Sequence, residues 1–266
     1  MDYVTLANGV KMPQLGYGVY QVTKEECERC VLDALDVGYR AIDTAQSYFN
    51  EAEVGEAIAK SGIDRKEIFL TTKVWIEHYG YENTKISVLK SMEKLKTDYI
   101  DLVLLHQPFA DYYGAYRALE DLYEEGKLRA IGVSNFYPDR LVDMASFARI
   151  KPMVNQIETH PLNQQIEGHE WLEKYGVIHE AWAPFGEGRG NMFTNPVLQE
   201  IGKKYDKTVA QVILRWQLQR GIVIIPKSTH KERMAQNLDV FDFTLTDEDM
   251  QDIAALDTKT SSFFSH

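Results

Sequence analysis

Short apolar runs alternate along the chain with longer segments in which apolar residues recur every three or four positions. The short runs are rich in Val, Ile, Leu and Thr and show little polar alternation, which is typical of parallel strands covered on both faces. The longer segments have the spacing of amphipathic helices. The predicted strands lie in residues 16–20, 41–43, 68–73, 100–106, 130–134, 152–158, 177–183 and 222–227, and the predicted helices in 24–37, 51–60, 83–95, 112–124, 139–147 and 208–219.

This succession predicts the fold class. Eight strand–helix units, spaced by roughly 30 residues, are expected for an α/β protein with a (β/α)8 TIM barrel. The 266 residues suit one barrel domain spanning 1–266. A doubly wound sheet is the alternative, but it normally carries G-x-G-x-x-G after the first strand, and this sequence does not.

Two further segments are predicted outside the strand–helix units. Asn8 and Gly9 stand between two short apolar runs, which favours an N-terminal β-hairpin with a type I′ turn. We expect that hairpin to cap the barrel floor. Residues 184–195 are rich in glycine and lack any period, so they are predicted to form a surface loop after the seventh strand.

Composition restricts the partners. The net charge of −11 and the lack of a basic stripe make a nucleic-acid partner unexpected. No run of 18 apolar residues and no signal peptide are found, so we expect a cytoplasmic protein that does not cross a membrane. Cys27 and Cys30 have C-x-x-C spacing, but three neighbouring glutamates would raise their thiol pKa values. We therefore interpret them as two small residues of an amphipathic helix.

Candidate chemistry gathers where the predicted strands end. Asp43 ends the second strand and Tyr48 follows in its loop, while Lys73 and His106 end the next two strands. In a barrel these ends converge on one face, where reactive groups belong. A lysine that closes a buried run needs a partner, and Asp43 on the neighbouring strand can supply it.

These four side chains suit proton donation to an oxygen. The ordinary pKa of tyrosine is about 10. An adjacent Lys73 ammonium would lower the pKa of Tyr48, Asp43 would hold Lys73 in place, and His106 would orient a carbonyl oxygen. No Ser, Cys or metal cluster offers itself as the attacking group, so a hydride from a cofactor is the natural choice.

At this point the sequence resembles the aldo-keto reductase family, from residue 6 to about residue 257. The blocks "IDTAQSY" with "NE", "LTTKVW", "LVLLHQP", "IGVSNF", "NQIETHP" and "IPKS" match in order and spacing, most closely those of small bacterial members. The resemblance implies NADPH-dependent reduction of aldehydes and ketones to alcohols by a monomer, without a metal. It also implies a catalytic tetrad of Asp43, Tyr48, Lys73 and His106, with Tyr48 as the acid.

The resemblance also places the cofactor. Ser134, Asn135 and Gln156 match residues that hold the nicotinamide carboxamide, Trp182 matches the ring that stacks on it, and "IPKS" with its following Arg matches the pocket for the 2′-phosphate, which favours NADPH over NADH. The full implied set is Gly18, Val19, Tyr20, Asp43, Ser134, Asn135, Gln156, Trp182, Ala183, Pro184, Lys227, Ser228, Thr229, Arg233, Gln236 and Asn237. Ala183 and Gln236 depart from the usual Ser and Glu.

The expected substrate pocket is aromatic around a polar anchor. Gln107 stands where Trp is common, which weakens any expectation of bulky substrates, and the short tail after Asp257 predicts an open site for small aldehydes, α-dicarbonyls and keto sugars. Its residues are Tyr20, Phe49, Trp75, His106, Gln107 and Phe109, with Phe263 and Phe264 able to fold back over it.

Two other functions stay open from the sequence alone. A barrel aldolase would use Lys73 as a Schiff base, but that chemistry needs a lysine that is not paired with a carboxylate. A nucleotide-sensing or nucleotide-binding subunit would have no need of the acid Tyr48.

Overall fold

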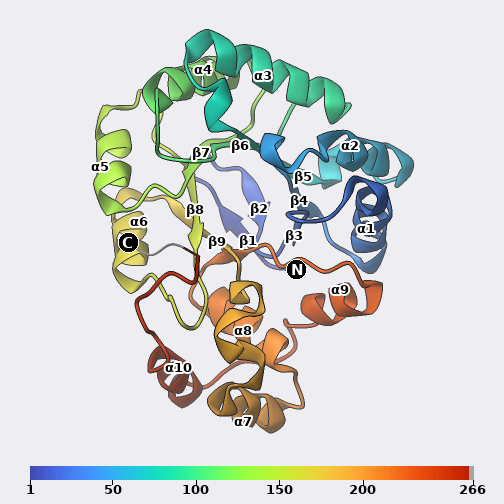
Figure 1. Cartoon of the computed structure of the whole chain (residues 1–266), viewed down its shortest axis with the longest axis vertical. Coiled ribbons are helices and arrows are strands. Elements are labelled where there is room, and N and C mark those ends of the chain that lie inside the picture. The colour runs from blue at the N-terminus through green and yellow to red at the C-terminus, as the bar shows by residue number, and fades with distance from the viewer. Residues whose placement is uncertain (264–266) are drawn as a thin grey trace.

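The computed structural model describes residues 1–263, in which eight parallel strands curl around a central axis with helices outside them (Figure 1). A parallel bridge between Leu15 and Ile224 links the chain beside the first strand to the last. This arrangement is consistent with a (β/α)8 fold. Each predicted run coincides with one strand, and only β5 extends beyond its run, by one residue. The strands are β3 (Tyr17–Gly18), β4 (Ala41–Asp43), β5 (Phe69–Val74), β6 (Leu102–Leu105), β7 (Ile131–Ser134), β8 (Val154–Glu158), β9 (Ile178–Trp182) and β10 (Val223–Ile224).

The six predicted helices are confirmed to within two residues at either end. They are α1 (Lys24–Val37), α2 (Glu51–Lys60), α3 (Tyr81–Lys94), α4 (Tyr112–Glu124), α5 (Pro138–Phe147) and α8 (Val209–Gln219). The structure adds four helices of ten residues or fewer, α6 (Ile166–Tyr175), α7 (Pro196–Tyr205), α9 (Lys231–Leu238) and α10 (Asp247–Ala254), and the short 3₁₀ segments η1 (Gln46–Tyr48), η2 (Arg65–Glu67), η3 (Ile76–His78) and η4 (Gly186–Thr194).

The N-terminal hairpin is a separate antiparallel sheet of β1 (Tyr3–Thr5) and β2 (Lys11–Pro13). Leu6 and Met12 pack with residues at the starts of the parallel strands, among them Phe69. The predicted type I′ turn is wrong. The register leaves residues 6–10 as the loop, and Gly9 has φ +87° whereas Asn8 does not take the left-handed conformation that this turn requires.

The main core lies between the strands and the helices. Because the strands are covered on both faces, β5 to β8 have buried residues at every position. Cys27 and Cys30 belong to this core, and burial raises the pKa of Cys27 to about 12, which agrees with a packing role. Among the described helices, none is both long and apolar enough to cross a membrane.

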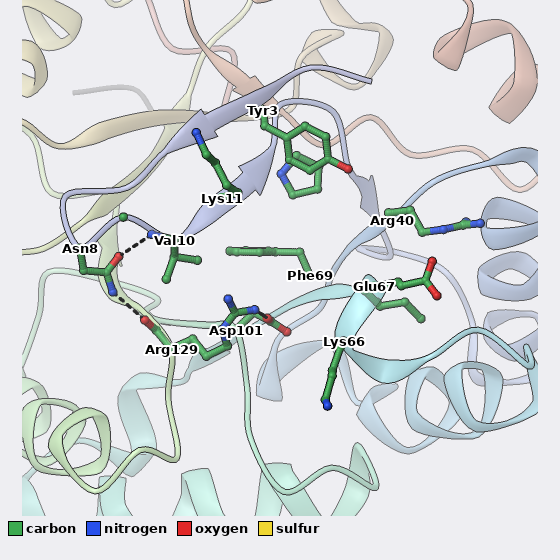
Figure 2. A pocket seen from close by; sticks show the side chains of 13 residues that line it. Tyr3, Asn8, Val10, Lys11, Arg40, Lys66, Glu67, Phe69, Asp101 and Arg129 are labelled. Atoms are coloured by element: carbon green, nitrogen blue, oxygen red, sulfur yellow. Dashed lines mark hydrogen bonds and ion pairs between the residues drawn. The ribbon is translucent and has the colours of Figure 1, made fainter.

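A polar pocket of about 580 Å³ lies beside the hairpin, between the loop that carries Asn8 and the starts of the strands (Figure 2). Most of its charged groups are bound to the protein itself, the exceptions among the described residues being Lys66 and Glu67. Asp101 pairs with Arg129 at 2.8 Å and with Arg65 at 2.9 Å, and Lys11 donates to Thr5 Oγ1. We call this cavity the floor pocket.

Candidate active site

The four residues predicted at the strand ends meet at one point. Lys73 Nζ lies 2.5 Å from Asp43 Oδ1 and 3.2 Å from the Tyr48 hydroxyl, and it also donates to the carbonyl of Thr44 at 3.0 Å. The Lys73 side chain is 0 % exposed. A buried ammonium with three oxygen partners is satisfied, so this geometry keeps Lys73 charged inside the sheet.

The fold explains why these residues meet. β4 and β5 pair in parallel, so Asp43 and Lys73 lie on neighbouring strands near the carboxyl ends. Residues 44–48 then turn back through η1, which places the Tyr48 ring above Lys73, with Nζ 4.9 Å from its centroid. The next residue, Phe49, has φ +57° and ends this turn.

The pKa of Tyr48 differs from the prediction. Burial raises the pKa of the phenol, and the Lys73 ammonium offsets that rise only in part, so the pKa of Tyr48 is about 12. Burial alone would lower the pKa of Lys73, but Asp43 and the phenol outweigh it and the pKa is raised. The expectation that Lys73 brings the phenol pKa below its ordinary value is therefore wrong, because desolvation is the larger effect.

His106 lies beside the phenol. Its ring packs edge-on against the rings of Tyr48 and Trp75, with centroid distances of 5.8 Å and 5.2 Å, respectively. Its Nδ1 lies 3.3 Å from Ser47 Oγ. Burial, followed by the charge of Lys73, lowers the pKa of His106 to about 3. The imidazole is therefore neutral at pH 7 and can donate one N–H to an oxygen in the cavity.

These groups line a cavity of about 770 Å³, which we call the central cavity. Three predicted residues line neither this cavity nor the one described next: Val19 and Lys73 are buried, and Phe109 is 60 % exposed on the surface. The predicted residues that do line it are Gly18, Tyr20, Asp43, Tyr48, Phe49, Trp75, His106, Gln107, Ser134, Asn135, Gln156, Trp182, Ala183, Pro184 and Lys227.

A second cavity, of about 590 Å³, lies beside the start of α9 and shares Lys227, Phe185 and Phe193 with the central cavity. Together they form a continuous trough. Lys231 pairs with Asp36, whereas Lys227 and Arg233 have no ion-pair partner in the described part of the chain. The predicted residues that line this second cavity are Lys227, Ser228, Thr229, Arg233, Gln236 and Asn237.

The side chains of Asn135, after β7, and Trp182, at the end of β9, are joined by a hydrogen bond. The Trp182 indole donates to Asn135 Oδ1 at 2.8 Å, and Asn135 Nδ2 donates to the carbonyl of His106 at 3.1 Å. Asn135 has φ +63°, a conformation that asparagine tolerates better than most residues. Asn135 thus fixes the orientation of the Trp182 ring in the cavity.

Several lining residues were not foreseen. The Gly-rich segment 184–195 contributes Phe185 and Phe193, and five residues within η4 depart from helical angles, so it retains the irregular backbone expected of a loop. Arg189 of this segment lies over the Phe263 ring at 4.3 Å and donates to the carbonyl of Ser262 at 2.6 Å. Phe263 in turn packs against Trp182, at 5.1 Å between ring centroids.

The tail is therefore a wall of the central cavity. Its other anchor is Glu158, a buried carboxyl that accepts from Ser261 Oγ at 2.6 Å and from the Ser262 N–H at 2.8 Å. The prediction that Phe263 folds back over the pocket is confirmed, while Phe264 lies outside the described residues. The tail is thus held by Arg189 on one side and by Glu158 on the other.

A parallel α/β fold with a lysine-supported phenol and a neutral imidazole in a deep trough is the arrangement of a carbonyl oxidoreductase. The comparisons agree with this class. The model of the aldo/keto reductase family matches residues 6–258. The glyoxal reductase of Bacillus subtilis (strain 168) is 49% identical over 257 residues, covering 96% of this chain and 92% of the relative. The chain belongs to the aldo/keto reductase family.

Solved structures support the same assignment. An aldo-keto reductase from a deep-sea metagenome library is 44% identical, with a TM-score of 0.95 over 99% of this chain and 97% of that chain. The aldo-keto reductase of Bombyx mori, solved in complex with NADP, is 33% identical, with a TM-score of 0.93 over 99% and 95% of the two chains. This protein is thus an oxidoreductase of carbonyl compounds that uses a nicotinamide cofactor.

Proposed function

We propose that this protein reduces small aldehydes, α-dicarbonyl compounds and keto sugars to alcohols with NADPH. The observation that carries the proposal is the contact of 3.2 Å between Lys73 Nζ and the Tyr48 hydroxyl at the base of the central cavity. The proposal includes a closed (β/α)8 barrel, with the whole chain as one domain and the hairpin at its floor. The bridge between Leu15 and Ile224 supports closure.

The side chains divide the proton chemistry among them. Bound NADPH supplies the hydride. The neutral His106 donates an N–H to the carbonyl oxygen and so orients it, and Tyr48 gives its proton to that oxygen as negative charge develops there. A pKa of about 12 keeps the phenol protonated at pH 7, and an alkoxide is a much stronger base than a phenolate, so the transfer is downhill. Lys73 then stabilises the phenolate, and Asp43 holds Lys73 in place.

The trough fits a dinucleotide with a 2′-phosphate. Lys227 and Arg233 face the second cavity without ion-pair partners among the residues described, and the Ser228 hydroxyl lies beside them. Unpaired cations near the start of α9 suit a phosphate dianion. We assign the other end to the nicotinamide, with Trp182 stacked on its ring and Ser134 and Gln156 near the carboxamide.

The shape of the central cavity supports small substrates. Trp75, Phe49 and Tyr20 surround the anchor His106, and Phe263 closes the side next to Trp182. Gln107 places a polar amide in the cavity wall, where a tryptophan would instead add apolar surface for a bulky substrate. The relative in Bacillus subtilis is named for glyoxal, a small dicarbonyl, and we extend that substrate class to this chain.

The two alternative functions fit less well. Lys73 is 0 % exposed and bonded to Asp43, so its amine cannot attack a carbonyl as a Schiff-base aldolase requires. A nucleotide sensor would not need a phenol supported by a buried ammonium. The proton-donating group is the feature that separates a reductase from both.

A kinetic panel tests the proposal. The oxidation of NADPH is followed by its absorbance with methylglyoxal, a nitrobenzaldehyde and a keto sugar, and then with NADH in place of NADPH. We expect turnover with the small aldehydes and a much lower KM for NADPH than for NADH. Flat traces with every carbonyl, alongside tight NADPH binding, would favour the sensor, and a substrate adduct on Lys73 after borohydride treatment would favour the aldolase.

A further inference from the structure

The proton chemistry above makes no use of Glu180, a buried carboxyl near Asp43. Glu180 of β9 is 1 % exposed, and the register places it between Gln156 of β8 and Val223 of β10. Together with Asp43 it lines a small space of about 10 Å³, enough for about one water. In the described part of the chain no cation lies within ion-pair distance of Glu180, so its carboxyl is not neutralised by a salt bridge.

Its one hydrogen-bond partner among the described residues is the side chain of Gln156. Gln156 Nε2 lies 2.9 Å from Asp43 Oδ2 and 3.0 Å from Glu180 Oε2. An amide nitrogen carries two hydrogens, so both are used by the two carboxyls. The ionised Asp43 can only accept, which means that the nitrogen and not the oxygen of the amide must face it.

This arrangement decides which way the Gln156 amide points. With both hydrogens directed at carboxyls, the amide oxygen Oε1 is left for the central cavity, which Gln156 lines. The described residues supply no donor to that oxygen. If the Glu180 acceptor were removed, one N–H would lose its partner in a buried place, and the amide would gain freedom to rotate about its last bond.

We propose that Glu180 is a positioning residue, whose buried carboxyl locks the Gln156 amide with its oxygen presented to the nicotinamide carboxamide. This inference rests on the function proposed above. Burial, and then the charge of Asp43, raises the pKa of Glu180 to about 8. Burial and the charge of Asp43 thus both disfavour the ionised form of Glu180 beside the Asp43–Lys73 pair.

Three variants test this role through NADPH binding, measured by the quenching of protein fluorescence in the absence of substrate. Glu180→Leu removes the acceptor at similar size, and we expect the Kd for NADPH to rise about ten-fold. Glu180→Gln keeps an acceptor oxygen and is expected to stay within about two-fold of wild type. In a Gln156→Leu background, Glu180→Leu should add less than about two-fold, since the group it positions is already absent.

Circular dichroism of each variant establishes that it is folded. If Glu180→Leu does not fold, Glu180→Asp, which withdraws the acceptor by one methylene, takes its place in the same cycle. An unchanged Kd in a folded Glu180→Leu protein, or an equal loss in both backgrounds, would overturn the role of Glu180. Wild-type protein that does not bind NADPH would overturn the proposed function itself, so the two failures are distinguishable.

Discussion

The molecule has cavities of comparable size at its two ends, and their charges are arranged in opposite ways. The floor pocket, about 580 Å³, is lined by four cationic side chains. Arg40 donates to the backbone carbonyls of Leu35 and Tyr39, and Figure 2 shows Lys66 extending away from the hairpin. In the central cavity, about 770 Å³, the buried charges are paired beneath the surface.

The difference lies in what each cavity leaves available. At the floor, most of the charged groups bind one another, a hydroxyl or the backbone, while Lys66 and Glu67 have no side-chain partner among the described residues. In the central cavity the paired charges serve the Tyr48 phenol and the His106 imidazole, which face the open space. A count of charged residues would favour the floor, but the phenol and imidazole that face the central cavity support our proposal that the reaction takes place there.

Of the changes that test this difference between the two cavities, replacement of the Tyr48 phenol should have the largest effect on activity. In Tyr48→Phe the proton donor is lost while the ring and its contact with Tyr20 remain. We expect kcat for aldehyde reduction to fall about a thousand-fold, with little change in the Kd for NADPH. Steady-state kinetics and fluorescence titration measure the two quantities. Retention of most of the activity would exclude Tyr48 as the acid.

Removal of Arg233, a cation without an ion-pair partner among the described residues, should have the second-largest effect. In Arg233→Ala one charged contact to the 2′-phosphate disappears, a loss of roughly 1.5–3 kcal/mol. The KM for NADPH should therefore rise about ten- to a hundred-fold, while the KM for NADH changes little. Lys231→Ala is the matched control, because Lys231 starts the same helix but is paired with Asp36. Equal effects on both cofactors would contradict the phosphate role.

A change at the floor should have the smallest effect. Arg129 is 43 % exposed and its partner Asp101 keeps Arg65, so Arg129→Gln should cost less than about 1 kcal/mol of unfolding free energy. Chemical denaturation measures that cost, and kcat/KM for NADPH-dependent reduction should stay within about two-fold of wild type. A marked loss of activity in this variant would break the distinction between the two ends.

Features that depend on hydrophobic periodicity and on the order of the strands could be predicted from the sequence. The proximity of Asp43, Lys73 and His106 could be predicted because each closes an apolar run, and parallel strands bring their carboxyl ends together. Their catalytic roles stay a prediction. The helices that were missed have ten residues or fewer, and two of them, α6 and α7, contain only two and three buried residues respectively. So short an apolar stripe gives a weak periodic signal.

The residues that were misplaced depend on side-chain direction. Val19 stands between Gly18 and Tyr20, which line the cavity, and successive side chains of an extended chain point to opposite sides. Phe109 follows β6 in a loop whose course no pattern specifies. Glu180 looked like any polar residue in an apolar run, and only the register of β8 and β9 shows that it lies inside.

The pKa of Tyr48 was misjudged for a related reason. A motif shows that an ammonium is near, but it does not show how much water the phenol has lost. Burial is a property of the assembled turn, strand and cavity together, and it outweighs the neighbouring charge. Charge partners can thus be predicted from the sequence more readily than solvation.

The complete enclosure of Lys73 also has a consequence for its reactivity. An amine that is 0 % exposed, charged, and bonded to three oxygens has neither the lone pair nor the access that an acylating or alkylating reagent needs. Reagents that modify amines would meet the outward-facing lysines first and leave this one untouched for as long as the strands stay together. In the proton delivery that we propose, the supporting ammonium is thereby shielded from covalent damage by the same packing that gives it its charge partner.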